Sequence, residues 1–303
     1  MTAAARASTS RDAAWIAFAG RVRRAWPPAL VNPTLALGAT VAWLFLGRRR
    51  RTIARNIEAL SGTSDRRALR RHSRAAFRHF AICHADMLAL PSLTTDQIRA
   101  RVAISGFSHL ADALARGHGV VLVGPHLGGF EFGTVALAAT VRPMTAVVES
   151  IDPARDALFA RLRTQTGLRL IPADAGAPRA ALRALRKGEV LLVAGDRALR
   201  SSHRVALAFG HESRPVPTGP AWLAIRAGAP ALTGYAVLTN DTPARYQIVI
   251  EPEVSAADLG ADPVVELTRR IAERLGAAAA RFPDQWFVFD PHWVAHDGSS
   301  RST

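Results

Sequence analysis

The chain has 303 residues, 49% of them hydrophobic, so it can bury a large core in one large domain or two small ones. Its formal net charge is +15, and Lys187 is the only lysine, so arginine carries nearly all of the positive charge. This charge favours anionic partners such as acidic lipid, a phosphorylated cofactor or nucleic acid. The single cysteine, Cys83, excludes an internal disulfide and a cysteine zinc site.

Both ends of the chain, residues 1–10 and 296–303, are small and polar and are predicted to be disordered. No secretory signal is evident, because the apolar stretch begins late and no small-residue cleavage site follows it. Together with the lone cysteine, this favours a reducing setting that faces the cytoplasm.

Residues 11–95 are predicted to form an N-terminal helical region that associates with membrane. Ala29–Leu46 is its one candidate span, but Asn32 and Pro33 interrupt it and its length is at the lower limit for crossing a bilayer. Arginines flank it on both sides and give no orientation. We expect a helix lying against the membrane, with Trp26 and Trp43 near the headgroups. A buried core helix and a single span are the alternatives.

An apolar stripe follows at helical spacing. Phe77, Phe80, His84 and Met87 recur at steps of three and four, with arginines between them. Such a stripe faces either the membrane or the core, and the core is the commoner place.

From about residue 96 the pattern changes to alternating strands and helices. This predicts an α/β domain over 96–295, with a mostly parallel central sheet flanked by helices, forming one compact unit with the N-terminal region. The expected strands are Val120–Val123, Thr145–Glu149, Arg169–Pro172, Val190–Ala194, Val205–Phe209, Ala231–Leu238 and Tyr246–Glu251. The expected helices are His109–Arg116, Phe130–Ala139, Pro153–Thr166, Pro178–Lys187, Pro220–Ala227 and Pro263–Arg281.

The segment Gly119–Glu131 carries the clearest chemistry. A β-branched run ends at Pro125, and His126, two glycines and Glu131 follow at once. His126 is therefore expected at the carboxyl end of a strand, where open α/β sheets bind their ligands. The corner between strand and helix offers a base, a carboxylate and backbone N–H groups for a developing anion, which suits acyl transfer.

Several stronger catalytic motifs are absent. The sequence has no Gly-x-Ser-x-Gly elbow, no phosphate-cradling Gly-x-x-x-x-Gly-Lys loop, no Gly-x-Gly-x-x-Gly and no His-Glu-x-x-His. No covalent nucleophile is evident, so a histidine base would act directly on the hydroxyl of the acceptor.

With its His-x4-Glu motif, the chain resembles the lysophospholipid acyltransferase-like families, in particular the lipid A biosynthesis (lauroyl/myristoyl) acyltransferases and the phosphatidylinositol mannoside acyltransferases. Four further segments match these families in order, and the resemblance extends over about residues 15–293. They are His109–Gly119, Gly188–Arg197, Phe209-Gly followed by Pro217–Pro230, and Pro283-Asp-Gln-Trp286.

The resemblance assigns roles to three residues. It makes His126 the general base and Glu131 the motif acid, and it matches Glu149 to a glutamate that orients the histidine. Either glutamate would be the direct partner of His126. A nearby helix N-terminus is expected to keep the imidazole neutral. Without the resemblance, His126 would read as a core histidine held by backbone.

The resemblance also implies substrate-binding residues. Arg163, with Arg161 as a rival, would hold donor phosphates or polarise the thioester carbonyl. Asp196 would anchor that arginine or the acceptor headgroup, unless the two form a structural pair. Backbone N–H groups near Gly128 and Gly129 would stabilise the oxyanion. Arg197 is nearer the mannoside pattern, and Trp286 and Trp293 would wall an acyl tunnel or, more commonly, pack against the sheet.

The sequence thus predicts an O-acyltransferase at the cytoplasmic face of the cell membrane, peripheral or with a single span. It would transfer a fatty acyl group from acyl-CoA or acyl carrier protein to a hydroxyl of a membrane lipid or glycolipid. The thioester is a co-substrate, and no bound cofactor, metal or nucleic acid is expected. The alternative is a catalytically inactive lipid-binding or scaffold protein of the same fold, which thioester turnover would distinguish.

Overall fold

The computed structural model describes residues 28–141, 143–150, 156, 160, 163–164, 166–198, 203–239, 245–290 and 292–294. Its helices are α2 (Pro28–Phe45), α3 (Gly47–Ser61), α4 (Arg66–Ala89), the 3-10 turn η1 (Leu90–Ser92), α5 (Thr95–Arg99), α6 (Phe107–Ala115), α7 (Phe130–Thr140), α9 (Ala177–Arg186), α10 (Gly219–Ala227) and α11 (Pro263–Arg281). Its strands are β1 (Val102–Ser105), β2 (Val120–Gly124), β3 (Met144–Val148), β4 (Arg169–Pro172), β5 (Val190–Ala194), β6 (Arg204–Phe209), β7 (Glu212–Pro217), β8 (Ala231–Leu238) and β9 (Tyr246–Glu253).

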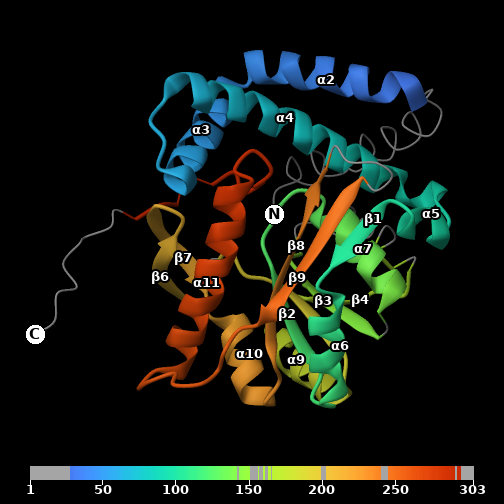
Figure 1. Ribbon diagram of the computed structural model, residues 1–303, viewed down its shortest axis with the longest axis vertical. Helices are drawn as coiled ribbons and strands as arrows, with labels where there is room; N and C mark the ends of the chain where they lie inside the picture. The colour runs from blue at the N-terminus through green and yellow to red at the C-terminus, as the bar shows by residue number, and fades with distance from the viewer. Residues whose placement is uncertain are drawn as a thin grey trace, which may run out of the picture.

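Seven strands form a central sheet in the order β1-β9-β8-β2-β5-β3-β4. The five strands from β8 to β4 run parallel to one another, β9 is antiparallel to β8, and β1 pairs in parallel with β9. The central strand β2 is a continuous run of buried valine and leucine, as a strand covered on both faces requires. The predicted class, a mostly parallel sheet flanked by helices, is confirmed (Figure 1).

Most of the predicted strands occur with nearly the predicted bounds, but one lies elsewhere. Val205–Phe209 falls in β6, which pairs antiparallel with β7 in a separate hairpin against α11 and not in the central sheet. Two strands, β1 and β7, were not predicted. Pro215 and Pro217 lie within β7, which prolines allow because the hairpin has only two strands and both are edges.

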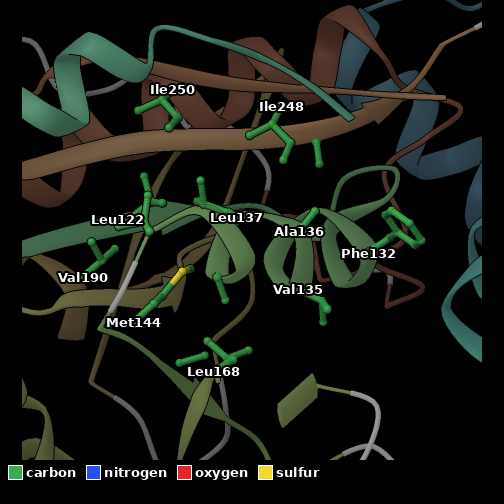
Figure 2. Close-up of a cluster of buried hydrophobic side chains, with 14 of the residues drawn as sticks. Leu122, Phe132, Val135, Ala136, Leu137, Met144, Leu168, Val190, Ile248 and Ile250 are labelled. Carbon is green, nitrogen blue, oxygen red and sulfur yellow. The ribbon is translucent and has the colours of Figure 1, made fainter. Parts of the chain in front are cut away.

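Helices cover both faces of the sheet. On one face, α6 packs against β2 and β9 and α7 packs against β8, with α4 and α5 behind α7; on the other face lie α9, α10 and α11. The helix α7 is apolar nearly all round and is buried, as such helices are. Figure 2 shows its Leu137 near Leu122 and Ile250, while Met144 and Leu168 lie on the other side of the helix.

The apolar helix α2 lies along α4 at one end of the molecule (Figure 1). Its outer side chains are exposed, with Leu37 at 67% and Phe45 at 82%, while Trp43 is 6% exposed. The expectation that Trp43 sits near headgroups is therefore wrong, because its indole donates to Ser73 on α4 and stacks against Arg50. In the described chain, no lone helix has the length and apolar character of a membrane span; α2 and α3 meet these criteria only together, with a 97° bend between them.

The apolar stripe on α4 belongs to the core. Met87 is buried in the main hydrophobic cluster, and Phe80 packs edge-on against Phe287 and Phe289. The membrane-facing alternative for this stripe is wrong.

Some predictions fall outside the described residues. These are the disordered ends, Trp26, Arg161 and most of the helix Pro153–Thr166. The division into a region 11–95 and a domain 96–295 stays a prediction.

Candidate active site

Three parallel strands end side by side at one edge of the sheet and bring together residues that are far apart in sequence. His126 follows β2, Asp196 and Arg197 follow β5, and Glu149 follows β3. Since the strand order is β2-β5-β3, the residues that follow β5 lie next to His126, and Glu149 lies one strand farther away. This edge is the ligand-binding edge of open α/β sheets.

Asp196 is the carboxylate that holds His126. Its Oδ1 is 2.7 Å from Nδ1 of the imidazole, and its Oδ2 accepts the backbone N–H of His126 at 2.8 Å. The indole N–H of Trp286 donates to the same Oδ2 at 2.8 Å. Asp196 is fully buried, so these donors fix its position and, through Nδ1, the ring of His126. The other ring nitrogen, Nε2, has no hydrogen-bond partner among the described residues and is available to a substrate.

This pairing sets the protonation of both groups. Burial alone would raise the pKa of Asp196, but the charge of His126 and the hydrogen bonds lower it to about 2. Burial alone would lower the pKa of His126, but the charge and hydrogen bond of Asp196 outweigh it, so the pKa of His126 lies above its ordinary value. The net shift in the pKa of His126 is therefore opposite to the one expected from a helix N-terminus, because the nearby carboxylate dominates.

The two predicted partners of His126 bind arginines instead. Glu131, in the first turn of α7, forms a two-point pair with Arg163, whose Nε donates to Oε2 at 2.8 Å. Glu149 pairs with Arg197. The expectation that Glu131 or Glu149 contacts His126 directly is corrected, as is the expectation that Asp196 anchors Arg163: Asp196 is nearer to the ring, and each glutamate has its own arginine.

The two glycines do not form the expected oxyanion site. The N–H of Gly128 donates to the carbonyl of Gln285 at 2.7 Å, so it is already occupied. A Cβ on Gly129 would lie 2.3 Å from the ring of Tyr246, so this position must be glycine to let the turn pack down on β9. Both glycines are buried and neither lines the cavity described below. Their role is to shape the turn that carries His126.

Trp286 has a more specific role than tunnel wall or packing residue. Besides its bond to Asp196, it pairs with Leu127 in a short antiparallel bridge, and the next residue, Phe287, donates its N–H to the carbonyl of His126 at 2.8 Å. The neighbouring Gln285 exchanges two hydrogen bonds with the backbone of Leu238. The Pro-Asp-Gln-Trp segment therefore clamps the turn after β2.

Arg214 of β7 is a residue that the sequence did not reveal. Its guanidinium is buried among the rings of Phe209, Trp286 and Trp293, at 4.7–5.6 Å from their centroids. It donates to Asp290, whereas Nε and Nη1 have no hydrogen-bond partner within the described chain. Burial lowers the pKa of Arg214, and the charge of Asp196 opposes this shift. A cation thus lies behind Asp196. Its sequence signal was weak, an arginine directly before a proline.

His126 lines a cavity of about 920 Å³, near the upper end of the usual range for small-molecule sites. The charged part of its lining consists of Glu131, Glu149, Asp156, Arg163, Asp174 and Arg197. The apolar lining is larger and includes Leu137, Met144, Leu168, Ile248 and Ile250, several of which surround α7 in Figure 2. The cavity can therefore hold a long apolar group and place a polar group beside the histidine.

Comparison with known proteins identifies the family of the chain. The family model of bacterial lipid A biosynthesis acyltransferases matches residues 5–295. Phosphatidylinositol mannoside acyltransferase of Mycolicibacterium smegmatis is 27% identical over 282 residues, which cover 91% of this chain and 89% of that protein. Proteins of the same name from two strains of Mycobacterium tuberculosis are 27% identical over 224 residues, 71% of this chain and 68% of each. Since the family model covers nearly the whole sequence, the chain belongs to the bacterial lipid A biosynthesis acyltransferase family and is an acyltransferase that acts on lipids or glycolipids.

Proposed function

We propose that the chain transfers a fatty acyl group from a thioester donor, acyl-CoA or acyl carrier protein, to a hydroxyl of a membrane glycolipid, with His126 as general base. One observation carries this proposal. The imidazole is held at Nδ1 by a fully buried carboxylate and lines a large, mostly apolar cavity, which suits a base acting beside an acyl chain.

The reaction needs one proton carrier and no covalent enzyme intermediate. Nε2 of His126 takes the proton of the acceptor hydroxyl as its oxygen attacks the thioester carbonyl. Ionised Asp196 stabilises the imidazolium that forms. The tetrahedral intermediate then expels the thiolate, which takes the proton from His126 and leaves as a thiol. Ester, thiol and neutral histidine result.

Arg163 and the first-turn N–H groups of α7 are the donors proposed to stabilise the oxyanion of the tetrahedral intermediate. Arg163 lines the cavity and is held by Glu131, so its charge is fixed close to the start of the helix. The helix start adds partial positive charge to that of the guanidinium. This pair replaces the glycine N–H groups in the proposed mechanism.

The acceptor is proposed to be a glycolipid because of the relatives. The M. smegmatis relative acts, by its name, on a phosphatidylinositol mannoside and covers nearly the whole chain. Glu149 and Arg197 line the cavity, and these polar groups suit the hydroxyls and phosphate of such a headgroup.

The outer face of α2 is the proposed membrane contact, which would place the protein as a peripheral enzyme on the cytoplasmic face. Exposed apolar side chains cover this face, and exposed arginines follow at once in α3; the residues are Leu30, Leu37, Val41, Leu44 and Phe45, then Arg48, Arg49 and Arg51. Apolar side chains that insert into the bilayer, next to arginines that bind phosphate, suit a membrane with anionic lipids.

The double variant Leu37→Glu with Phe45→Glu should abolish flotation with anionic vesicles and leave the circular dichroism spectrum unchanged. Undiminished flotation would contradict this contact.

The test of the reaction is acyl transfer by the purified chain from radiolabelled acyl-CoA, or acyl carrier protein, to extracted glycolipid. His126→Ala should lower kcat/KM at least ~10²-fold, the usual scale for a general base. His118→Ala is the matched control, because that histidine is exposed in the loop between α6 and β2 and does not line the cavity. Normal turnover by His126→Ala would overturn the mechanism. Lipid binding with no turnover in the wild type would favour the inactive lipid-binding alternative.

A further inference from the structure

A second hollow of about 730 Å³ runs along α9 beside the cavity. We call it the α9 groove, and its lining consists of Ala175, Gly176, Pro178, Arg179, Leu182, Arg183, Arg186 and Trp222. Pro178 and Trp222 line the main cavity as well, so the two hollows adjoin where α9 packs against α10. A ligand that occupies the cavity can therefore continue into the groove.

The helix α9 presents a row of arginines to this groove. Ala181 and Leu185 are buried toward the sheet, while Arg179, Arg183 and Arg186 are exposed. Steps of four and three residues put the three guanidinium groups on one helix face. The helical rise places about 10 Å between the first and the last, which is enough to serve more than one phosphate.

No carboxylate in the described residues forms an ion pair with these arginines, and the acids on either side of α9 have other partners. Asp174 accepts the N–H of Gly176 at 2.8 Å. Glu189 pairs with Arg169 and accepts the hydroxyl of Thr145 at 2.7 Å. The groove therefore keeps its positive charge available, and guanidinium groups bind phosphate oxygens in pairs.

Trp222 adds a flat apolar surface at the junction of the two hollows. Its side chain is 39% exposed, whereas Trp43 and Trp286 are buried. An exposed indole beside arginines is a stacking platform for a nucleic acid base. The combination of arginine row and indole points to a ligand that has both phosphates and an aromatic base.

We propose that the α9 groove binds the nucleotide end of a coenzyme A thioester. Its phosphates lie on Arg179, Arg183 and Arg186, its adenine lies on Trp222, and the pantetheine arm passes Pro178 to bring the thioester to His126. This inference rests on the proposed function, because it assumes that the cavity takes the acyl chain of a thioester. It selects the donor, since an acyl carrier protein offers neither an adenine nor a ribose phosphate.

The binding test is calorimetric titration of the full chain with adenosine 3′,5′-bisphosphate and with coenzyme A. Arg179→Gln/Arg183→Gln/Arg186→Gln should weaken both at least about tenfold, because each charge-assisted phosphate contact is strong. The matched control, Arg66→Gln/Arg67→Gln/Arg71→Gln, removes the same charge from exposed positions on α4, at the other end of the molecule (Figure 1), and should bind as the wild type does. Trp222→Leu should weaken adenosine bisphosphate and leave inorganic pyrophosphate unchanged.

The kinetic test compares acyl-CoA with acyl-pantetheine, which has the same thioester but no nucleotide. The triple α9 variant should raise KM for acyl-CoA at least about tenfold and change the use of acyl-pantetheine by less than about twofold. Equal loss with both donors, or equal nucleotide binding by the α9 and α4 variants, would overturn the proposal.

Failure of the proposed function gives a different result. If the wild type transfers no acyl group from any donor but binds adenosine bisphosphate through α9, the nucleotide site stands and the acyl transfer does not. If it accepts acyl carrier protein and neither binds nor uses coenzyme A, acyl transfer stands and the α9 site is wrong.

Discussion

Asp196 and Glu149 follow parallel strands at the same edge of the sheet, yet they are held in opposite ways. Asp196 has no exposed surface, and three hydrogen bonds from His126 and Trp286 occupy its two oxygens. Glu149 leaves 36% of its side chain exposed and pairs with Arg197, which is equally exposed. A buried carboxylate whose oxygens are occupied by donors is held in one position. In an exposed ion pair, either side chain can leave its partner and bind a ligand or water instead. The first is suited to hold a base and the second to meet a substrate.

The largest effect should come from Asp196→Asn. Oδ2 receives two N–H donors, so the single amide oxygen of asparagine would take that place and its NH2 group would face Nδ1 of His126. The ring would then carry its proton on Nε2 and could not act as a base. We expect kcat/KM to fall at least ~10²-fold with the fold retained. Activity within threefold of wild type would remove Asp196 from the mechanism.

The free energy of unfolding of Asp196→Asn, compared with that of Glu149→Gln, tests whether Asp196 is the more firmly held carboxylate. A native pKa of about 2, against about 3.9 in the unfolded chain, corresponds to about 3 kcal/mol, shared with His126. Since the pKa is lowered, this contribution is present above about pH 4 and is lost as pH falls toward 2. Urea unfolding at pH 6 should show Asp196→Asn destabilised by about that amount and Glu149→Gln near wild type. Equal losses would contradict the contrast.

Arg163→Lys tests the ion pair of Arg163 with Glu131, whose exposure lies between that of Asp196 and that of the Glu149–Arg197 pair. Lysine keeps the charge but loses the two-point contact with Glu131, so we expect about a tenfold loss in kcat/KM. Arg169→Lys is the control, because it alters another arginine–glutamate pair that does not line the cavity. Equal losses in the two variants would assign Arg163 to structure alone.

The pH profile gives a smaller but directional effect. Asp196 raises the pKa of His126, so the acidic limb of kcat/KM in the wild type should lie above the ordinary histidine value of about 6.5. The base works when neutral, and activity should therefore rise with pH through this limb. In Asp196→Asn the limb should move to lower pH. A limb that stays in place would assign it to another group.

Glu149→Gln should have the smallest effect. The side chain is a third exposed and does not contact His126, so loss of its pair with Arg197 should change kcat less than about threefold. A change in KM for the glycolipid without a change in kcat would place this pair at the acceptor. A loss as large as that of Asp196→Asn would reverse the assignment of the two carboxylates.

The local pattern of the sequence predicted most of the fold. Apolar runs rich in valine and leucine predicted the bounds of β5 and β8 as the structure has them, because such runs are typical of buried strands. The bounds of the edge strand β4 were also predicted correctly. The local pattern did not give β1, which is a short edge strand, or β7, whose prolines are typical of loops.

Most members of the candidate site were predicted from the sequence, but their pairing was not; Gly128 and Gly129 do not line the cavity, and Arg214 was missed. His126, Glu131, Glu149, Arg163 and Asp196 all lie at the cavity or directly behind it. The resemblance implied Glu131 or Glu149 as the partner of His126, whereas the sheet inserts β5 between β2 and β3 and so places Asp196 next to the ring. Strand order depends on long-range pairing, and no local pattern encodes it.

The clamp on the turn after β2 also determines when, during synthesis of the chain, the hydrogen-bonded arrangement around His126 can be completed. His126, Asp196 and Trp286 are separated by 70 and then 90 residues, and the last of them follows α11. During translation the nascent chain therefore exposes its histidine long before the ribosome has released the indole that completes the arrangement. A prematurely terminated chain that ends before residue 285 would lack Trp286 and Phe287, and with them the hydrogen bonds that fix Asp196 and the turn that carries His126.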